Sequence, residues 1–169
     1  MHYHTIQYRV ELIEGCLVGQ FPEELQPMSM DMREMYYPYN ECPEMIWADT
    51  SGKIQVTFQA IEKKMTPPET ASAAEAIREY TERLYPREEI LPVHLYREGE
   101  IPVGWFVMKL EINREQQRHV KAVLSVYNKM CILTLTYPEP EHLKWEIVLK
   151  NMFAALHRIG EKNGIGKGA

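Results

Sequence analysis

Residues 105–136 read WFVMKLEINREQQRHVKAVLSVYNKMCILTLT, and this stretch decides the fold. It contains runs rich in β-branched and aromatic residues, which are typical of strands; the runs cover residues 105–112, 119–127 and 130–136. Asn113-Arg114-Glu115 and Asn128-Lys129 separate them and are too short for a crossover connection. Consecutive strands joined by short turns run antiparallel, so the stretch predicts an antiparallel meander.

Further strands are expected on the N-terminal side of the meander. Apolar and polar residues alternate over 6–12 and again over 54–60, which predicts two strands that each bury one face. The remaining expected strands cover 16–18, where Gly19 ends the pattern, 45–48 and 91–96. The segments 45–48 and 54–60 form a hairpin in which Gly52 takes positive φ.

Two helices are expected. The first begins at Thr66-Pro67-Pro68-Glu69, which supplies a capping hydroxyl, a proline in the first turn and a carboxylate three residues on, and it ends before Pro86. The second covers about 139–159, with Gly160 as its stop. Its apolar stripe recurs at spacings of four and three and consists of Trp145, Leu149, Met152, Leu156 and Ile159. The sequence therefore predicts an α+β fold, with one antiparallel sheet of about six or seven strands flanked by helices.

Length and composition favour one α+β domain over residues 1–159, followed by a flexible C-terminal tail over 160–169. The net charge of −5 disfavours nucleic acid and anionic membranes as partners. No apolar run approaches the roughly 20 residues that span a bilayer, and the first residues do not resemble a signal peptide. The three cysteines, Cys16, Cys42 and Cys131, form no metal or disulfide pattern. We therefore expect a cytoplasmic protein.

The proline-interrupted loop 22–44 is the most distinctive surface candidate. Ser29 or Asp31 caps at most one turn of helix there, through Met35. Tyrosine and methionine give large, adaptable contact areas, so we predict that an unidentified protein partner binds here. The alternative is that these side chains pack onto the domain's own core. The candidate partner-binding residues are Met28, Met30, Met32, Met35, Tyr36, Tyr37, Tyr39 and Trp47.

Motifs for catalysis are missing from the sequence. No serine has a Gly-x-Ser-x-Gly context, and the glycines after residue 159 do not form a phosphate loop, so no cofactor is predicted. A small-molecule-binding or hydrolase-like enzyme remains an alternative, with a site between the sheet and the 22–44 loop that uses His94 or His119. Copper handling through the methionines, or through His2 and His4, is a second alternative, although no metal site is predicted.

The order of these elements is similar to the Mog/PsbP-like fold, an antiparallel sheet sandwiched by helices, over most of residues 5–159. The local pattern of Phe21-Pro22, Tyr37-Pro38 and Pro43 before the hairpin also resembles small uncharacterised domains from Firmicutes. The resemblance implies protein binding, because Mog members bind a small GTPase, PsbP members bind a membrane photosystem, and bacterial relatives include chaperone-like adaptors. The leading hypothesis is thus a non-enzymatic interaction or adaptor domain in a bacterium.

Overall fold

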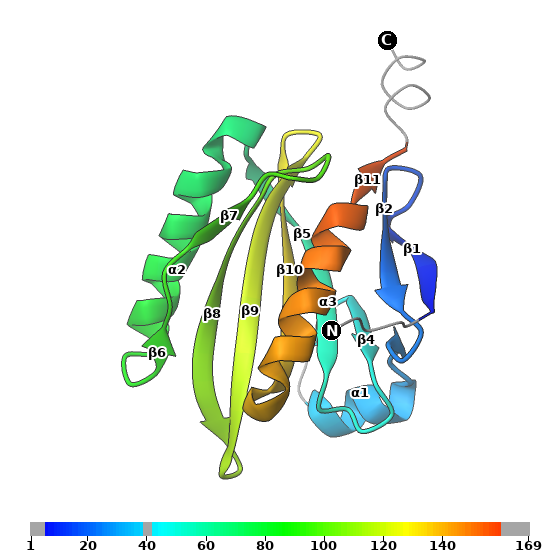
Figure 1. Cartoon of the computed structure of the whole chain (residues 1–169), viewed down its shortest axis with the longest axis vertical. Coiled ribbons are helices and arrows are strands. Elements are labelled where there is room, and N and C mark those ends of the chain that lie inside the picture. The colour runs from blue at the N-terminus through cyan, green and yellow to red at the C-terminus, as the bar shows by residue number, and fades with distance from the viewer. Residues whose placement is uncertain (1–5, 39–41, 160–169) are drawn as a thin grey trace.

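The computed structural model describes residues 6–38 and 42–159 (Figure 1). The helical segments are α1 (Met30–Tyr36), η1 (Pro67–Glu69), α2 (Thr70–Leu84), η2 (Glu139–Glu141) and α3 (His142–Ala155). The strands are β1 (Gln7–Ile13), β2 (Leu17–Pro22), β3 (Gln26–Pro27), β4 (Met45–Ala48), β5 (Gln55–Lys64), β6 (Glu89–Ile90), β7 (His94–Tyr96), β8 (Val103–Ile112), β9 (Glu115–Val126), β10 (Lys129–Pro138) and β11 (His157–Arg158). Within the described part of the chain, no helix is long and apolar enough to cross a membrane.

The main sheet has eight strands in the order β3-β4-β5-β10-β9-β8-β6, with β7 also paired to β8. The predicted meander is confirmed, since β8, β9 and β10 pair antiparallel with their neighbours. Ile112 pairs with Glu115 and Val126 with Lys129, so each hairpin has a loop of two residues. All four loop residues have positive φ, which matches the twist that two-residue hairpins require.

One prediction about the sheet is wrong: β1, β2 and β11 form a separate three-stranded sheet. Gly19 also does not end the second strand, because it lies inside β2 opposite Val10. A Cβ atom at Gly19 would lie 3.4 Å from Leu12 Cδ1 and 3.6 Å from Leu156 Cδ2. These are ordinary packing distances, so Gly19 lies in the interior of the small sheet beside Leu12 and Leu156.

The C-terminal helix is shorter than predicted. It ends at Ala155, and Leu156 has extended backbone with ψ of 126°. His157 and Arg158 then pair with Val18 and Leu17 as β11. Leu156 lies beyond the end of the helix, but its side chain is buried like the rest of the apolar stripe. The apolar pattern in the sequence therefore extends past the helix. The Gly160 stop and the tail 160–169 lie outside the described residues.

Helices lie on opposite faces of the main sheet (Figure 1), which confirms the predicted α+β architecture. On β9, Val123 packs in a cluster with Ala74 of α2, whereas Ala122 and Leu124 belong to the core that contains Trp145 of α3. Successive side chains of a strand point to opposite faces, so α2 and α3 cover different faces. α2 covers only part of its face, and this leaves room for the site described below.

The 22–44 loop folds largely as expected. α1 is a short helix capped by Ser29, whose Oγ accepts a hydrogen bond from the Met32 amide at 3.2 Å. The predicted hairpin is confirmed as β4 and β5, with Gly52 at φ of 77° in the loop. α1 lies beside this hairpin loop (Figure 1), and a Cβ atom at Gly52 would lie within 2.5 Å of the Tyr36 hydroxyl. Glycine is therefore needed both for the turn and for the close approach of α1.

Candidate functional site

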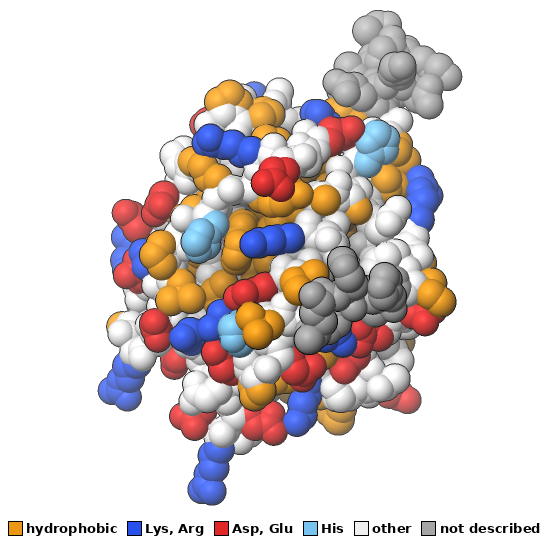
Figure 2. Space-filling view, viewed as in Figure 1, with side chains coloured by type: hydrophobic (Ala, Val, Ile, Leu, Met, Phe, Trp, Pro, Cys, Tyr) orange, Lys and Arg blue, Asp and Glu red, His pale blue; other side chains and the backbone are white. Residues whose placement is uncertain are grey.

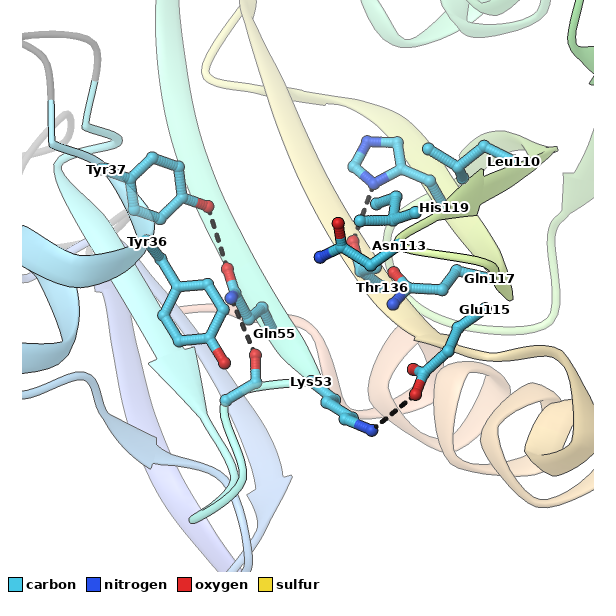
Figure 3. A pocket seen from close by; sticks show the side chains of 12 residues that line it. Tyr36, Tyr37, Lys53, Gln55, Leu110, Asn113, Glu115, Gln117, His119 and Thr136 are labelled. Atoms are coloured by element: carbon cyan, nitrogen blue, oxygen red, sulfur yellow. Dashed lines mark hydrogen bonds and ion pairs between the residues drawn. The ribbon is translucent and has the colours of Figure 1, made fainter.

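The sheet face opposite α3 carries an open cavity between α1 and the β8–β9 hairpin, which we call the sheet groove (Figure 3). Its volume is about 440 Å³. Tyrosines form one side, polar side chains form the floor, and apolar side chains of β8 form the other side. The lining residues are Tyr36, Tyr37, Gly52, Lys53, Gln55, Leu110, Ile112, Asn113, Glu115, Gln117, His119 and Thr136.

The floor of the groove follows from strand register. Gln55 of β5 lies opposite Thr136 of β10, which lies opposite His119 of β9. Gln117 is two residues before His119 and so points to the same face. The residues next to Thr136 and His119 along their strands, Leu135 and Val120, are buried in the α3 core. A period of two along each strand thus gathers polar groups on one face.

Tyrosines of the α1 segment form one wall. The Tyr37 hydroxyl donates to Gln55 Oε1 at 2.9 Å, and Gln55 Nε2 donates to the Gly52 carbonyl at 2.8 Å (Figure 3). The Tyr36 hydroxyl donates to the Ser51 carbonyl at 3.1 Å. Burial, with the nearby Cys42, raises the pKa of Tyr37, so its hydroxyl keeps its proton at neutral pH. These bonds tie α1 to the β4–β5 hairpin and fix the wall.

An ion pair links the two sides at one end of the groove. Lys53 Nζ lies 3.0 Å from Glu115 Oε1, and joins the β4–β5 loop to the start of β9 (Figure 3). The two side chains are 51% and 50% exposed, so the pair is screened by salt and contributes little stability. Its structural effect is to leave the groove lining with no free charge at this end.

His119 is the titratable group of the floor. Its Nδ1 lies 2.8 Å from Thr136 Oγ1. Burial first, and the charge of Lys121 second, lower the pKa of His119 to about 4. Burial also lowers the pKa of Lys121 itself. At neutral pH the His119 ring is therefore uncharged and offers one hydrogen-bond donor and one acceptor.

The groove lining offers hydrogen-bonding groups and a histidine that is a weak base at neutral pH. A general base works best with a pKa near the operating pH, and a pKa of about 4 makes His119 a weak base at pH 7. Among the described residues that line the groove, Glu115 is the one carboxylate, and it pairs with Lys53. No serine or cysteine is among these lining residues. The chemistry on offer is hydrogen bonding from amides, hydroxyls and a neutral imidazole, beside apolar contacts.

The structure divides the described partner-binding candidates among four places: the groove, a packed cluster, the exposed surface of α1 and the α3 core. Tyr36 and Tyr37 line the groove, while Met28, Met32 and Tyr37 pack with Ile46 and Ala48 behind the wall. Met30 and Met35 are 70% and 67% exposed on α1. Trp47 points to the opposite side of the sheet, into the α3 core, and its ring packs edge-on to Phe21 at 4.9 Å. Tyr39 lies outside the described residues.

The residues of the two alternatives are also separated. His94 stacks on Trp105 at 5.0 Å, away from the groove that holds His119. The four methionines do not gather, because two are in the packed cluster and two are exposed. In the ranges 6–38 and 42–159, no group of three or more His, Cys, Asp and Glu side chains is placed to hold a metal. His2 and His4 lie outside these ranges.

Sequence reasoning missed most of the groove floor. Gln55, Gln117 and Thr136 belong to no motif, and the sequence alone does not show that these polar side chains are buried or half-buried together. The available signal was weak: Gln55 is a polar residue in an alternating strand, and His119 begins another. Which of these polar positions share a face depends on the pairing of β5 with β10, two strands that are far apart in sequence.

No family model and no curated protein matches this sequence. Solved structures do match. PsbP of the cyanobacterium Synechocystis sp. PCC 6803 superposes with a TM-score of 0.61 at 10% identity, covering 92% of this chain and 94% of that one. This chain has the PsbP-like fold. The Firmicutes resemblance stays a prediction.

Two further structures agree on the fold. A protein from Bacteroides thetaiotaomicron has a TM-score of 0.62 at 8% identity, and the match covers 90% of this chain and 49% of that one. LpqN of Mycobacterium tuberculosis, which is involved in cell envelope biogenesis, has a TM-score of 0.56 at 10% identity, with 93% and 92% covered. At such low identity these likenesses show the fold and no shared residues or activity.

These neighbours contradict the predicted cytoplasmic location. PsbP and LpqN match over more than nine tenths of their chains, and LpqN takes part in cell envelope biogenesis. The prediction relied on the first residues and on cysteines without a disulfide pattern. Cys16, Cys42 and Cys131 are indeed free. Free cysteines are also compatible with other compartments, so they do not fix the location.

Proposed function

We propose that this chain is a non-catalytic binding domain that holds an extended segment of a partner protein in the sheet groove. The observation that carries this proposal is the uncharged polar floor of Gln55, Thr136 and His119, left open beside the tyrosine wall. Beyond its bonds to Tyr37 and Gly52, Gln55 keeps one N–H and one carbonyl lone pair, and His119 keeps the ring nitrogen that does not contact Thr136. These groups can pair with the N–H and C=O groups of a peptide. The fold neighbours are consistent with a non-catalytic domain.

The rim of the groove supports a protein partner. Tyr36 is partly exposed at the groove, and Met30 and Met35 are exposed on the same short helix. Tyrosine gives contact area at low entropic cost, and methionine adapts to varied partners. Met30 and Met35 are 70% and 67% exposed, so a bound partner would bury apolar surface at both.

The hydrolase alternative is disfavoured by the same groove. Its histidine is a weak base at neutral pH, and its carboxylate is neutralised by Lys53. A purely small-molecule ligand is a second candidate, because about 440 Å³ falls within the usual size of ligand pockets, roughly 300–1,000 Å³. The two candidates differ in what remains attached to the groove after purification.

Site-specific photocrosslinking tests the proposal. A photoreactive phenylalanine derivative replaces Tyr36 in cells of the organism that encodes the chain, and the same group at Tyr80, which is exposed on α2, is the control. We expect a discrete crosslinked protein from position 36 only. Gln117→Ala removes a floor amide and should weaken this product, whereas Gln116→Ala, on the adjacent exposed position of β9, should not.

Other outcomes contradict the protein partner. The same products from positions 36 and 80 would mean nonspecific capture. A low-mass compound retained by the wild-type protein in native mass spectrometry, and lost from Gln117→Ala, would favour the small-molecule candidate instead. Turnover of ester substrates that is abolished by His119→Gln would support the hydrolase alternative.

A further inference from the structure

A second groove lies where the small sheet meets the free edge of β5, and we call it the edge groove. Its volume is about 600 Å³. Glu11, Leu12, Ile13 and Glu14 of the β1 end form one side, and β4 and β5 form the other with Glu44, Met45, Phe58, Gln59 and Ala60. It shares no lining residue with the sheet groove.

Among residues 6–38 and 42–159, none pairs with the outer edge of β5 beside this groove. β4 begins at Met45, opposite Phe58, so none of its residues lies opposite Ala60. The Met28 amide donates to the Ile46 carbonyl, which shows that the Ile46 backbone faces β3 and the Met45 backbone faces β5. The backbone N–H and C=O groups of Phe58 therefore point toward β4. Because these groups point to alternate sides along a strand, those of Ala60 point to the same side as those of Phe58, which is the open edge.

The groove combines an apolar floor with unpaired negative charge. Leu12 and Phe58 are buried, and both contribute to the lining. Glu14 and Glu44 are exposed at its sides, and neither carboxylate has an ion-pair partner within the described ranges. Both lie at the end of the edge away from Lys63 and Lys64. A segment that binds at this end of the groove is therefore expected to carry positive charge.

We propose that the edge groove pairs with an extended segment of another protein by adding it as a strand to β5, with basic residues of that segment beside Glu14 and Glu44. Strand addition satisfies the backbone groups of the free edge and gives affinity, while side-chain pockets give specificity. Lys63 and Lys64 further along the edge disfavour pairing between two copies of this chain, because charged edge residues oppose edge-to-edge association. This surface is independent of the sheet groove.

Designed peptides test the proposal on the whole chain. The probe is a peptide of about eight residues in which valine and threonine alternate and two arginines stand at one end, made in both sequence orders. Backbone amide NMR should show a shift and slowed hydrogen exchange at Ala60, the last residue before the register irregularity of β5, for one order. Glu14→Gln combined with Glu44→Gln should weaken binding by about threefold to tenfold, as expected for two exposed charges. Glu98→Gln, an exposed carboxylate elsewhere, is the matched control.

A second peptide separates strand pairing from charge attraction. It has the same sequence with N-methyl groups on alternate residues, so it keeps its charge but cannot complete a ladder. Loss of its binding supports strand addition, and equal binding would overturn it. Unchanged amides at residues 59–62 would also overturn it, as would shifts that grow with protein concentration in the absence of peptide, since these would identify a second copy as the occupant.

Discussion

The two faces of the main sheet are covered in different ways. On the α3 face, Trp145, Leu149 and Phe153 are fully buried against β9 and β10. The opposite face is covered by α2 at one side and by α1 at the other, and between them lies a row of polar residues that ends at His119 (Figure 3). The difference shows that one face holds the fold together while the other leaves a binding surface open.

The outer surfaces follow the same division. Figure 2 shows the α3 side of the molecule, on which acidic and basic side chains are interspersed around apolar areas. Exposed side chains such as Leu143 and Ile147 occur there without a groove of polar lining. A mixed surface of this kind has no strong field of a single sign. The sheet groove on the other face is thus the more specific feature.

The strongest test of the comparison removes the centre of the α3 face. Trp145→Ala should lower the free energy of unfolding by about 3–5 kcal/mol, because Trp145 is 0% exposed and the deletion leaves a cavity. Urea denaturation measures this change. Ile147→Ala, at a side chain 41% exposed on the same helix, should cost less than about 1 kcal/mol. Near-wild-type stability of Trp145→Ala would mean that this face does not hold the core.

The second test uses the pH dependence of the polar face. The pKa of His119 falls from 6.5 to about 4 on folding, so below pH 6.5 the unfolded chain binds a proton that the folded chain does not. His119 therefore contributes stability that is present above pH 6.5 and is lost as the pH falls toward 4. The loss is roughly 2–3 kcal/mol, at 1.36 kcal/mol for each pKa unit with allowance for partial exposure.

Comparison with His119→Gln isolates this contribution. The variant should lose the slope of stability between pH 6.5 and 4.5. The pKa values of Glu69, Glu100 and Glu139 are also lowered in the folded protein. Their effect on stability, however, changes mainly below pH 4.5, the pKa of an unfolded glutamate. An unchanged slope in the variant would show that His119 protonates freely in the folded protein.

A third test concerns how tightly α2 covers its part of the polar face. A Cβ atom at Gly104 would lie 2.8 Å from Ala74 Cβ and 3.2 Å from the Thr70 carbonyl oxygen. Gly104→Ala should therefore destabilise the protein by about 1–3 kcal/mol through overpacking, measured as a lower melting temperature. Gly19→Ala, whose nearest contact would be 3.4 Å, should cost less. The reverse order would contradict the close packing of α2.

The smallest expected effect lies at the wall of the sheet groove. Tyr37→Phe removes the hydrogen bond to Gln55 and should lower stability by about 1 kcal/mol. Tyr36→Phe should change stability less, because its bond to Ser51 is exposed to water. Chemical denaturation of both variants measures the difference. Equal, negligible effects would mean that α1 is not held by this bond.

Much of the architecture could be read from local sequence. The alternation in residues 105–136, the two short turns and the Thr66–Glu69 capping box each depend on neighbours within a few positions. The structure confirms all three, and in the capping box the Thr66 amide donates to Glu69 Oε1 at 2.9 Å. Local predictions succeeded because period and capping are properties of contiguous residues.

The errors arose where contacts between distant residues decided the outcome. Leu156 continues the apolar stripe, yet β11 forms because His157 and Arg158 pair with β2 and bond to Glu100. Trp47 was predicted to belong to an aromatic surface. Side chains alternate between the two faces of β4, however, and Trp47 is on the face that packs into the core against Phe21. Neither contact leaves a sign in the local sequence.

The sequence by itself determined the α+β class, the meander, the capped helix α2 and the apolar face of α3, because each follows from the spacing of residues along one segment. Only the tertiary structure decided that Gln55 shares one floor with Thr136 and His119, because β5 had to pair in register with β10, which is far from it in sequence. It also decided that β5 keeps a free edge at Ala60, because that depends on where β4 begins.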